Sequence, residues 1–290
     1  MHSLCDFISR HRRLFVLTGA GCSTDSGIPD YRDASGHWKR SPPVSFQAFM
    51  GSEAVRQRYW ARSLVGWQRF RRAAPNGAHA ALARLEQQNR LEVLVTQNID
   101  GLHQAAGSTW VVDLHGRLDR VRCMDCYALL PRQELQDELL RCNFAWSRLE
   151  GVVAPDGDAD IEGLPFDEFT VPSCSRCNGV LKPDVVFFGE SVPRDRVATA
   201  MECLGRADAV LVVGSSLMVY SGYRFVQAAA QAGKPVAAIN LGRTRADGLL
   251  ALKVSEPCAS ALGSLPTGYY DTFPAVTGDN NASVLLGERC

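Results

Sequence analysis

The sequence contains no segment suited to crossing a membrane. No run approaches the roughly 18–20 consecutive apolar residues that a transmembrane helix needs. The apolar run Leu14–Leu17 is short and leads directly into glycines, so it does not have the form of a secretory signal peptide. We therefore expect no membrane partner, and we expect a soluble, reducing compartment.

The chain has no excess of charge of either sign. Its 31 Lys and Arg residues balance 31 Asp and Glu residues, which gives a pI near 7.0. Because non-specific binding to a phosphate backbone needs a basic surface, this balance argues against direct contact with nucleic acid. The 10 cysteines in 290 residues are also too sparse for a secreted disulfide scaffold.

Four short apolar runs have the continuous pattern of parallel strands that are buried on both faces. Each run ends in small or polar residues, and in an open α/β sheet such strand ends gather at one site. Amphipathic segments at Arg194–Leu204 and from Ser221 to Gly233 alternate with the runs, and Ser221 is expected to cap the second. This alternation predicts an α/β fold with a doubly wound, parallel, Rossmann-like sheet. The predicted strands are Leu14–Thr18, Leu91–Thr96, Ala209–Val213 and Val236–Asn240.

Two Cys-x-x-Cys pairs are the most informative local pattern in the chain. They supply four thiolates, the number that a tetrahedral structural zinc ion binds, and leave no open position for catalysis. The 47 residues from 127 to 173 separate the pairs, more than the roughly 15–20 of the usual zinc ribbon, so the module must carry an insertion. Four unrelated buried cysteines are the alternative. The predicted zinc ligands are Cys123, Cys126, Cys174 and Cys177.

Two regions interrupt the alternation of strands and helices and indicate a second, smaller domain. Residues 34–74, rich in Arg and Trp, are predicted to form a helical lobe over the site, and residues 118–178 form the zinc-ribbon module with an acidic insertion. The nucleotide-binding domain is then discontinuous and covers residues 1–117 and 179–263. The aperiodic tail 264–290 is expected to be poorly ordered.

A glycine-containing loop follows the first predicted strand. Its glycines let backbone N–H groups approach a pyrophosphate, which the N-terminus of a following helix also favours. The match to Gly-x-Gly-x-x-Gly is incomplete, because Thr24 stands where the third glycine belongs. A tight strand–helix turn without a ligand is the alternative. The acidic residue that an ordinary hydride-transfer Rossmann enzyme needs after its second strand is not evident.

Taken together, these patterns resemble the sirtuin family over about residues 5–263. The matching strings occur in the family's order, and so many ordered matches make chance negligible. Residues 219–224, residues 59–62 and the long insertion between the cysteine pairs look like the class II branch. The matching strings are Gly19-Ala20-Gly21, Gly27-Ile28-Pro29-Asp30-Tyr31-Arg32, Thr96-Gln97-Asn98-Ile99-Asp100-Gly101-Leu102-His103, Leu114-His115-Gly116, both cysteine pairs, residues 182–190, Gly214-Ser215-Ser216-Leu217 and Ile239-Asn240.

The resemblance implies NAD-dependent removal of acyl groups (acetyl, longer or acidic) from protein lysines, with NAD consumed as a co-substrate. In the family, the acyl oxygen attacks the nicotinamide ribose and expels nicotinamide. A histidine then deprotonates a ribose hydroxyl, and O-acyl-ADP-ribose is released. The Leu-His-Gly string assigns this general base to His115, and the ordinary pKa of histidine suits the role. The residues alone leave His103 as an alternative, because it also follows a polar strand end.

The resemblance also implies how NAD is held. The glycine loop cradles the phosphates, and Ile28 lines the nicotinamide pocket. Asn98 and Asp100 join His115 as catalytic residues near the nicotinamide ribose, with loop capping as their alternative role. The full predicted NAD site comprises Gly19, Ala20, Gly21, Thr24, Ile28, Pro29, Asp30, Tyr31, Arg32, Gln97, Asn98, Ile99, Asp100, Gly214, Ser215, Ser216, Asn240, Leu241, Gly242 and Cys258.

The acyl-lysine substrate is implied to bind as an added strand between two segments. The resemblance places Val186, Phe188, Gly189 and Val219 against it, with core packing as the alternative role of Phe188.

Tyr59 and Arg62 have the Tyr-x-x-Arg spacing with which class III sirtuins hold acidic acyl chains. Residues three apart share a helix face, so both side chains can reach one carboxylate. The alternative is that Tyr59 packs under the lobe while Arg62 meets solvent or the acidic insertion.

Two other functions remain open. The first is a protein mono-ADP-ribosyltransferase that uses the same NAD site, and the second is a zinc-ribbon module that binds NAD without turnover. The presence of both His115 and Asn98 argues against the second. We expect acyl-lysine proteins or peptides as partners and favour a monomer. A bacterial, cytoplasmic protein is expected, and the mitochondrial matrix is the alternative if a transit peptide has been removed.

Overall fold

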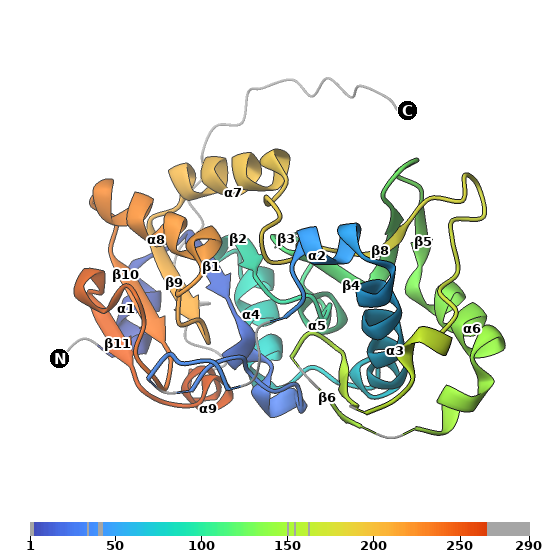
Figure 1. Cartoon of the computed structure of the whole chain (residues 1–290). Coiled ribbons are helices and arrows are strands. Elements are labelled where there is room, and N and C mark those ends of the chain that lie inside the picture. Colours follow the sequence, from blue (N-terminus) through green and yellow to red (C-terminus); the bar gives the residue numbers. More distant parts are fainter. Residues whose placement is uncertain are drawn as a thin grey trace.

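A six-stranded parallel sheet lies at the centre of the larger lobe of the computed structural model, which describes residues 3–33, 35–39, 43–149, 151–153, 155–161 and 163–265 (Figure 1). Its strand order is β11-β10-β9-β1-β2-β3, and every neighbouring pair is parallel. The predicted doubly wound α/β fold is confirmed. The strands are β1 (Leu14–Thr18), β2 (Leu91–Thr96), β3 (Val111–Asp113), β9 (Ala209–Val213), β10 (Val236–Ile239) and β11 (Leu252–Val254).

Four of these strands are the predicted ones, although β10 ends at Ile239, one residue earlier than predicted. The sequence does not indicate β3 or β11. Each has only three residues, and none of them is fully buried. Such short, half-buried strands carry neither a continuous apolar run nor a sustained alternation of apolar and polar residues.

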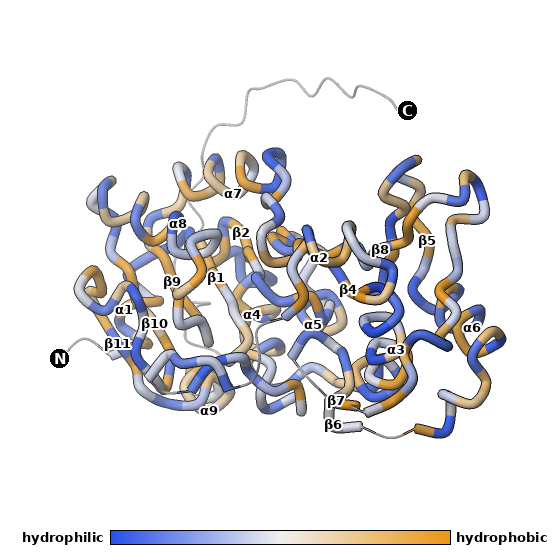
Figure 2. The backbone as a smooth tube through the Cα atoms, viewed as in Figure 1, coloured by the Kyte–Doolittle hydropathy of each residue, from blue (hydrophilic) through white to orange (hydrophobic). Residues whose placement is uncertain are grey.

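Helices cover both faces of the sheet, because successive residues of each strand point to opposite faces. Leu14 and Val16 of β1 share a core with α1, α4 and α9, whereas Phe15 and Leu17 share one with α7 and α8. Figure 2 shows apolar residues gathered along these central strands. The helices are α1 (Leu4–Arg10), α4 (Gly77–Gln87), the short α5 (Leu102–Ala105), α7 (Arg194–Arg206), α8 (Tyr220–Gln231) and α9 (Cys258–Gly263), with a 3-10 turn at Asp247–Leu249.

Helix α8 begins differently from the prediction. Ser221 is not its N-cap, because Val219 takes that position with an extended backbone and no side-chain hydrogen bond. Ser221 is instead the second helical residue, and its hydroxyl contacts a histidine ring. At the other end, Gly233 has a φ of +69°, a left-handed conformation that suits glycine and ends the helix as predicted.

The smaller lobe is built on an antiparallel sheet with strand order β5-β4-β8. Its core joins Trp60 and Leu64 of α3 to Leu118 of β4 and Leu135 of α6. Strand β8 pairs here although it lies within the range predicted for the nucleotide-binding domain, so the smaller sheet reaches Val185. The division into domains stays a prediction. The elements of this lobe are α2 (Phe46–Gly51), α3 (Glu53–Phe70), β4 (Gly116–Cys123), β5 (Leu129–Pro131), α6 (Arg132–Cys142), β6 (Val152–Val153), β7 (Ala159–Asp160), β8 (Leu181–Val185) and 3-10 turns at Phe144–Arg148 and Phe166–Glu168.

The predicted helical lobe at residues 34–74 is helical in part. Helices α2 and α3 fill most of it, but the described residues from 35 to 45 form no helix. The predicted tail, residues 264–290, lies outside the described residues from position 266 onward. Within the described ranges, no helix combines the length and the apolar character that crossing a membrane requires.

Candidate active site

The strand order of the large sheet reverses between β1 and β9. The chain leaves β1 toward β2 on one side and leaves β9 toward β10 on the other. Because these connections diverge, a crevice opens at the carboxyl ends of the two strands, where ligands of open α/β sheets bind. The glycine loop follows β1 and the segment beginning at Gly214 follows β9, so two predicted nucleotide segments meet at this reversal.

The two loops pack so closely that only glycine fits at several positions. The Gly21 N–H donates to the Gly214 carbonyl at 2.8 Å, and the Gly19 N–H donates to the Val213 carbonyl at 3.0 Å. A Cβ on Gly19 would lie 2.8 Å from the Cβ of Ser215, and one on Gly214 would lie 2.2 Å from the backbone nitrogen of Cys22. Both distances are shorter than a normal contact, so the glycines fix the loop geometry.

The helix expected directly after the glycine loop is absent. The chain forms two 3-10 turns instead, at Ala20–Cys22 and Thr24–Ser26, and the second ends at Gly27 with a φ of +83°. This part of the prediction is wrong, because the loop continues across the crevice before the chain reaches α2. Any phosphate here would therefore meet loop amides and not the dipole of a long helix.

A cavity of about 1010 Å³ occupies the crevice and extends between the two lobes. All of the predicted NAD and substrate residues line it except Arg62. The cavity is also lined by residues that the sequence analysis did not select, among them Ser23, Trp38, Asp156, Met218, Ser221 and Arg224. Ser23 was detectable as a polar residue within the glycine loop. The others lie outside the loops that carry a recognisable nucleotide pattern.

Asn98 and Asp100 are joined through Ser23. The Ser23 hydroxyl donates to Asp100 Oδ2 at 2.7 Å and accepts from Asn98 Nδ2 at 3.0 Å. Asn98 Nδ2 also donates to the Gly19 carbonyl at 3.0 Å, which ties the loop after β2 to the glycine loop. Asp100 Oδ1 accepts the Leu102 N–H at 2.9 Å, so Asp100 contacts the first residue of α5 as well as facing the cavity.

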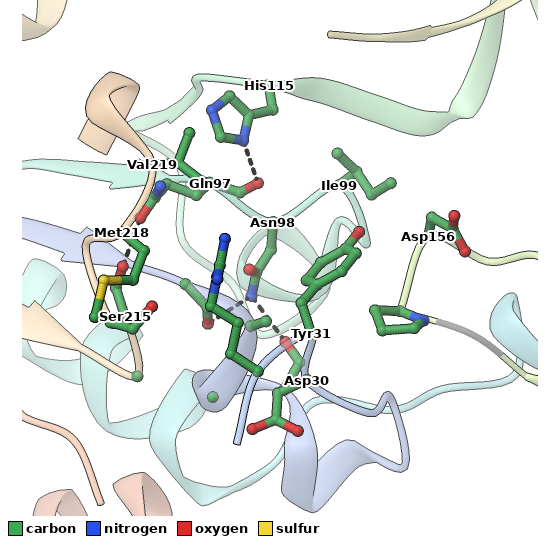
Figure 3. Close-up of a pocket in the computed structure, with 18 of the residues that line it drawn as sticks. Asp30, Tyr31, Gln97, Asn98, Ile99, His115, Asp156, Ser215, Met218 and Val219 are labelled. Atoms are coloured by element: carbon green, nitrogen blue, oxygen red, sulfur yellow. Dashed lines mark hydrogen bonds between the residues drawn. The ribbon is translucent and has the colours of Figure 1, made fainter. Parts of the chain in front are cut away.

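His115 stands at the wall of the cavity with both ring nitrogens engaged. Nδ1 lies 2.9 Å from the Gln97 carbonyl oxygen (Figure 3). Nε2 lies 2.8 Å from the Ser221 hydroxyl. Burial, followed by the nearby charges of Arg196 and Arg224, lowers the pKa of His115 from 6.5 to about 4. The imidazole is therefore neutral at physiological pH, which is the state a general base requires.

His103 does not reach the cavity. It is 1% exposed, and its Nε2 lies 2.9 Å from the Thr18 hydroxyl. Burial lowers its pKa to about 3, and its ring is tilted by 56° to the ring of His79, with the ring centroids 4.8 Å apart. With Cys22, these two histidines form a buried group of side chains behind the glycine loop. The structure thus separates the two histidines that the residues alone left as alternatives.

The four predicted zinc ligands come together at one edge of the smaller lobe. The Cys123 and Cys177 sulfurs are 3.5 Å apart, and those of Cys126 and Cys174 are 3.7 Å apart. All four lie within 4.8 Å of one another, and none forms a disulfide in the described part of the chain. Four thiolates with this spacing fit one tetrahedral zinc ion with no ligand position left for chemistry.

Tyr59 and Arg62 contact different partners in the structure. Tyr59 is 4% exposed and packs edge-on against Phe49 at 5.3 Å, with part of its ring on the cavity. The Nε of Arg62 lies 3.9 Å from a carboxylate oxygen of Asp158 in the acidic insertion. The structure therefore matches the alternative interpretation of this pair, because the Arg62 guanidinium is directed to Asp158.

The cavity opens beside three half-exposed apolar side chains. Phe188 is 38% exposed, Val219 37% and Tyr220 54%. The Phe188 ring packs edge-on against Trp38 at 5.5 Å, which links this mouth to the loop that carries Tyr31 and Arg32. An exposed apolar rim next to a deep, polar cavity is suited to binding an extended peptide whose side chain enters the cavity.

Comparison with known proteins gives a consistent result. A family model described as "Sir2 family" matches residues 19–221. The "NAD-dependent protein deacetylase 2" of Bradyrhizobium diazoefficiens is 66% identical over 263 residues, which cover 91% of this chain and 96% of that protein. The "NAD-dependent protein deacetylase" of Bordetella bronchiseptica is 63% identical over 265 residues, which cover 91% and 97%.

Solved structures show the same fold. One described as "Sir2-p53 peptide-NAD+" superposes with a TM-score of 0.72 at 29% identity and covers 89% of this chain and 93% of that one. Another, described as "Sir2 bound to acetylated peptide", gives a TM-score of 0.71 at 29% identity, with the same two coverages.

Proposed function

The chain belongs to the Sir2 family and is an NAD-dependent protein deacylase, and we propose that it acts on acylated lysines with His115 as the general base. The observation that carries this assignment is the position of His115. Its neutral ring stands on a cavity that also contains the glycine loop, Asn98 and Asp100. The similar proteins named NAD-dependent protein deacetylases support the same activity.

The residues of the crevice fit NAD. Glycine loop amides and the hydroxyls of Ser215 and Ser216 hold the pyrophosphate where the strand order reverses. Asn98 and Asp100 hold the nicotinamide ribose, and Ser23 keeps their side chains in place. The adenosine end contacts Asn240, Leu241, Gly242 and Cys258, which line the same cavity.

NAD would supply the ribose carbon that the acyl oxygen attacks, and NAD is consumed in the reaction. His115 contributes by receiving a proton at Nε2, because Nδ1 already carries one and donates it to the Gln97 carbonyl. The acyl-lysine enters at the mouth formed by Phe188 and Val219, with the Val186 carbonyl and Gly189 placed beside it.

The zinc ion holds the smaller lobe together. The bacterial relatives support a cytoplasmic enzyme.

Mass-resolved product analysis tests this function. With an acetyl-lysine peptide and NAD, the protein should produce free lysine peptide, nicotinamide and O-acetyl-ADP-ribose. His115→Ala should lower the deacylation rate by about 100-fold or more while NAD still binds. His37→Ala is the matched control, since His37 is exposed and does not line the cavity. ADP-ribose attached to protein without free O-acetyl-ADP-ribose would support the transferase alternative and contradict the proposal.

A further inference from the structure

The Ser221 hydroxyl occupies the position from which the general base must receive its proton. Ser221 is 8% exposed, lines the cavity, and lies 106 positions from His115 in the sequence. Its Oγ is 2.8 Å from His115 Nε2. This contact joins the first turn of α8 to the loop between β3 and β4.

The direction of this hydrogen bond follows from the other ring nitrogen. The Gln97 carbonyl oxygen, 2.9 Å from Nδ1, can only accept, so Nδ1 carries the proton of the neutral imidazole. Nε2 then presents a lone pair, and Ser221 must donate its hydroxyl proton to it. The atom that has to accept a proton in the reaction is therefore already hydrogen-bonded to Ser221.

The surrounding chain holds this arrangement from both sides. The Ser215 hydroxyl donates to Gln97 Oε1 at 2.7 Å and fixes the residue whose carbonyl orients His115. A Cβ on Gly222 would lie 2.6 Å from Gln97 Nε2, so α8 packs directly against the Gln97 side chain. The approach brings Ser221, the residue before Gly222, onto the His115 ring.

The first turn of a helix also favours negative charge. Helix α8 begins after Val219 without a side-chain cap, and the helix dipole is positive at this end. Ser221 is the second residue of this twelve-residue helix. Partial negative charge that develops on its oxygen during proton transfer is therefore stabilised where it forms.

We propose that Ser221 is a proton relay between the substrate and His115. The O–H bond of Ser221 breaks as its proton moves to His115 Nε2, and Ser221 Oγ takes up the proton of a ribose hydroxyl in the same step. His115 becomes an imidazolium, Ser221 is unchanged, and the ribose oxygen is left with the electron pair that attacks the acyl carbon. This inference rests on the proposed deacylase function and adds a further catalytic residue to it.

Ser221→Ala separates the relay from a structural role, because the reaction has a stage before the proton transfer. Exchange of labelled nicotinamide into NAD reports the expulsion of nicotinamide, which needs no base at the ribose hydroxyl. We expect Ser221→Ala to lower peptide deacylation by about 10- to 100-fold and to change nicotinamide exchange by less than about twofold. Ser221→Thr retains the hydroxyl and should keep most of the deacylation rate.

The hydrogen bond itself is measured without NAD. The 15N resonance of His115 Nε2, identified by its loss in His115→Ala, should move in Ser221→Ala and stay near its original position in Ser221→Thr. If Ser221→Ala does not fold, Ser221→Pro serves as the hydroxyl-free variant, because proline is tolerated in the first turn of a helix.

Three results would overturn the relay. The first is a hydroxyl-free variant that deacylates at the wild-type rate. The second is a variant in which deacylation and nicotinamide exchange fall by the same factor, and the third is an unchanged 15N resonance of His115 Nε2 in that variant. Each is judged against an active wild-type protein. A wild-type protein without NAD-dependent deacylation would contradict the proposed function, and so the two failures are distinguishable.

Discussion

Arg62 Nε lies 3.9 Å from a carboxylate oxygen of Asp158, whose side chain is only 5% exposed. The pair ties α3 to the insertion between the two cysteine pairs. Gly66, one turn further along α3, lies so close to this insertion that a Cβ would be 2.2 Å from the Gly157 carbonyl. The Arg62 side chain therefore contacts the insertion, and Arg62 does not line the cavity.

Arg62→Met should leave the acyl preference unchanged and lower stability. Removing the cation leaves the Asp158 carboxylate nearly buried without this partner, which costs about 2–3 kcal/mol of the free energy of unfolding. Urea unfolding and rates on acetyl-lysine and glutaryl-lysine peptides measure the two effects. Arg72→Met is the control, since Arg72 is exposed just beyond the end of α3. A selective loss of glutaryl-lysine activity would restore the acid-binding interpretation.

Ser23→Ala should weaken both stages of the reaction. The Ser23 hydroxyl holds Asp100 at 2.7 Å and Asn98 at 3.0 Å, so its removal releases both side chains at the nicotinamide ribose. We expect nicotinamide exchange and deacylation to fall together by about 10-fold, corresponding to roughly 1.4 kcal/mol. Ser9→Ala is the matched control, because the Ser9 hydroxyl donates to the Asp6 carbonyl and Ser9 does not line the cavity. A normal exchange rate in Ser23→Ala would show that Asn98 and Asp100 are held without it.

The deacylation rate should not change in mild acid. His115 must be neutral to accept a proton, and its pKa in the folded protein is about 4 because the ring is removed from solvent. Deacylation measured as kcat/KM should therefore stay level from pH 7 down to about 5 and decline as the pH falls through about 4. A decline centred near the ordinary histidine pKa of about 6.5 would mean that the ring is hydrated in the working enzyme.

The free energy of unfolding should fall as the solution becomes acidic. His115 and His103 have pKa values of about 4 and about 3 in the folded protein, below the 6.5 of an unperturbed histidine. Below about pH 6.5 both histidines are protonated in the unfolded chain but stay neutral in the folded protein. Each histidine therefore lowers the free energy of unfolding by about 1.4 kcal/mol per pH unit until the pH reaches its pKa in the folded protein. The free energies of unfolding of wild type and His115→Asn, measured by urea titration, should therefore approach each other as the pH falls from about 6.5 to about 4. A constant difference would contradict the depressed pKa of His115.

Zinc removal should unfold the smaller lobe. Cys123 and Cys174 are buried in the same core as Trp60 and Leu64, so losing the metal exposes that core. Strong chelation or Cys174→Ser should lower the melting temperature, reduce solubility and abolish deacylation, with zinc content falling from about one ion per chain. Cys5→Ser, in the first helix, is the control. Full thermal stability after metal removal would show that the ion is not structural.

The sequence alone predicted the features that local patterns encode. Continuous apolar runs such as Ala209–Val213 identified the central strands, since a strand buried on both faces has no polar position. The paired cysteines identified the zinc ligands, because a Cys-x-x-Cys turn brings two sulfurs together locally. Gly19 and Gly21 identified the nucleotide loop, because glycines after a strand let backbone N–H groups approach a pyrophosphate.

Only the tertiary structure decided how the remaining polar side chains are used. His103 and His115 both follow polar strand ends, but His103 is buried against His79 of α4 while His115 remains on the cavity. Ser221 resembled an ordinary helix cap until the approach of α8 to Gln97 placed its hydroxyl on His115. Arg62 had the spacing of an acid-binding pair, but an insertion that begins far along the chain supplied its carboxylate. Such contacts join residues distant in sequence, so no local period or spacing records them.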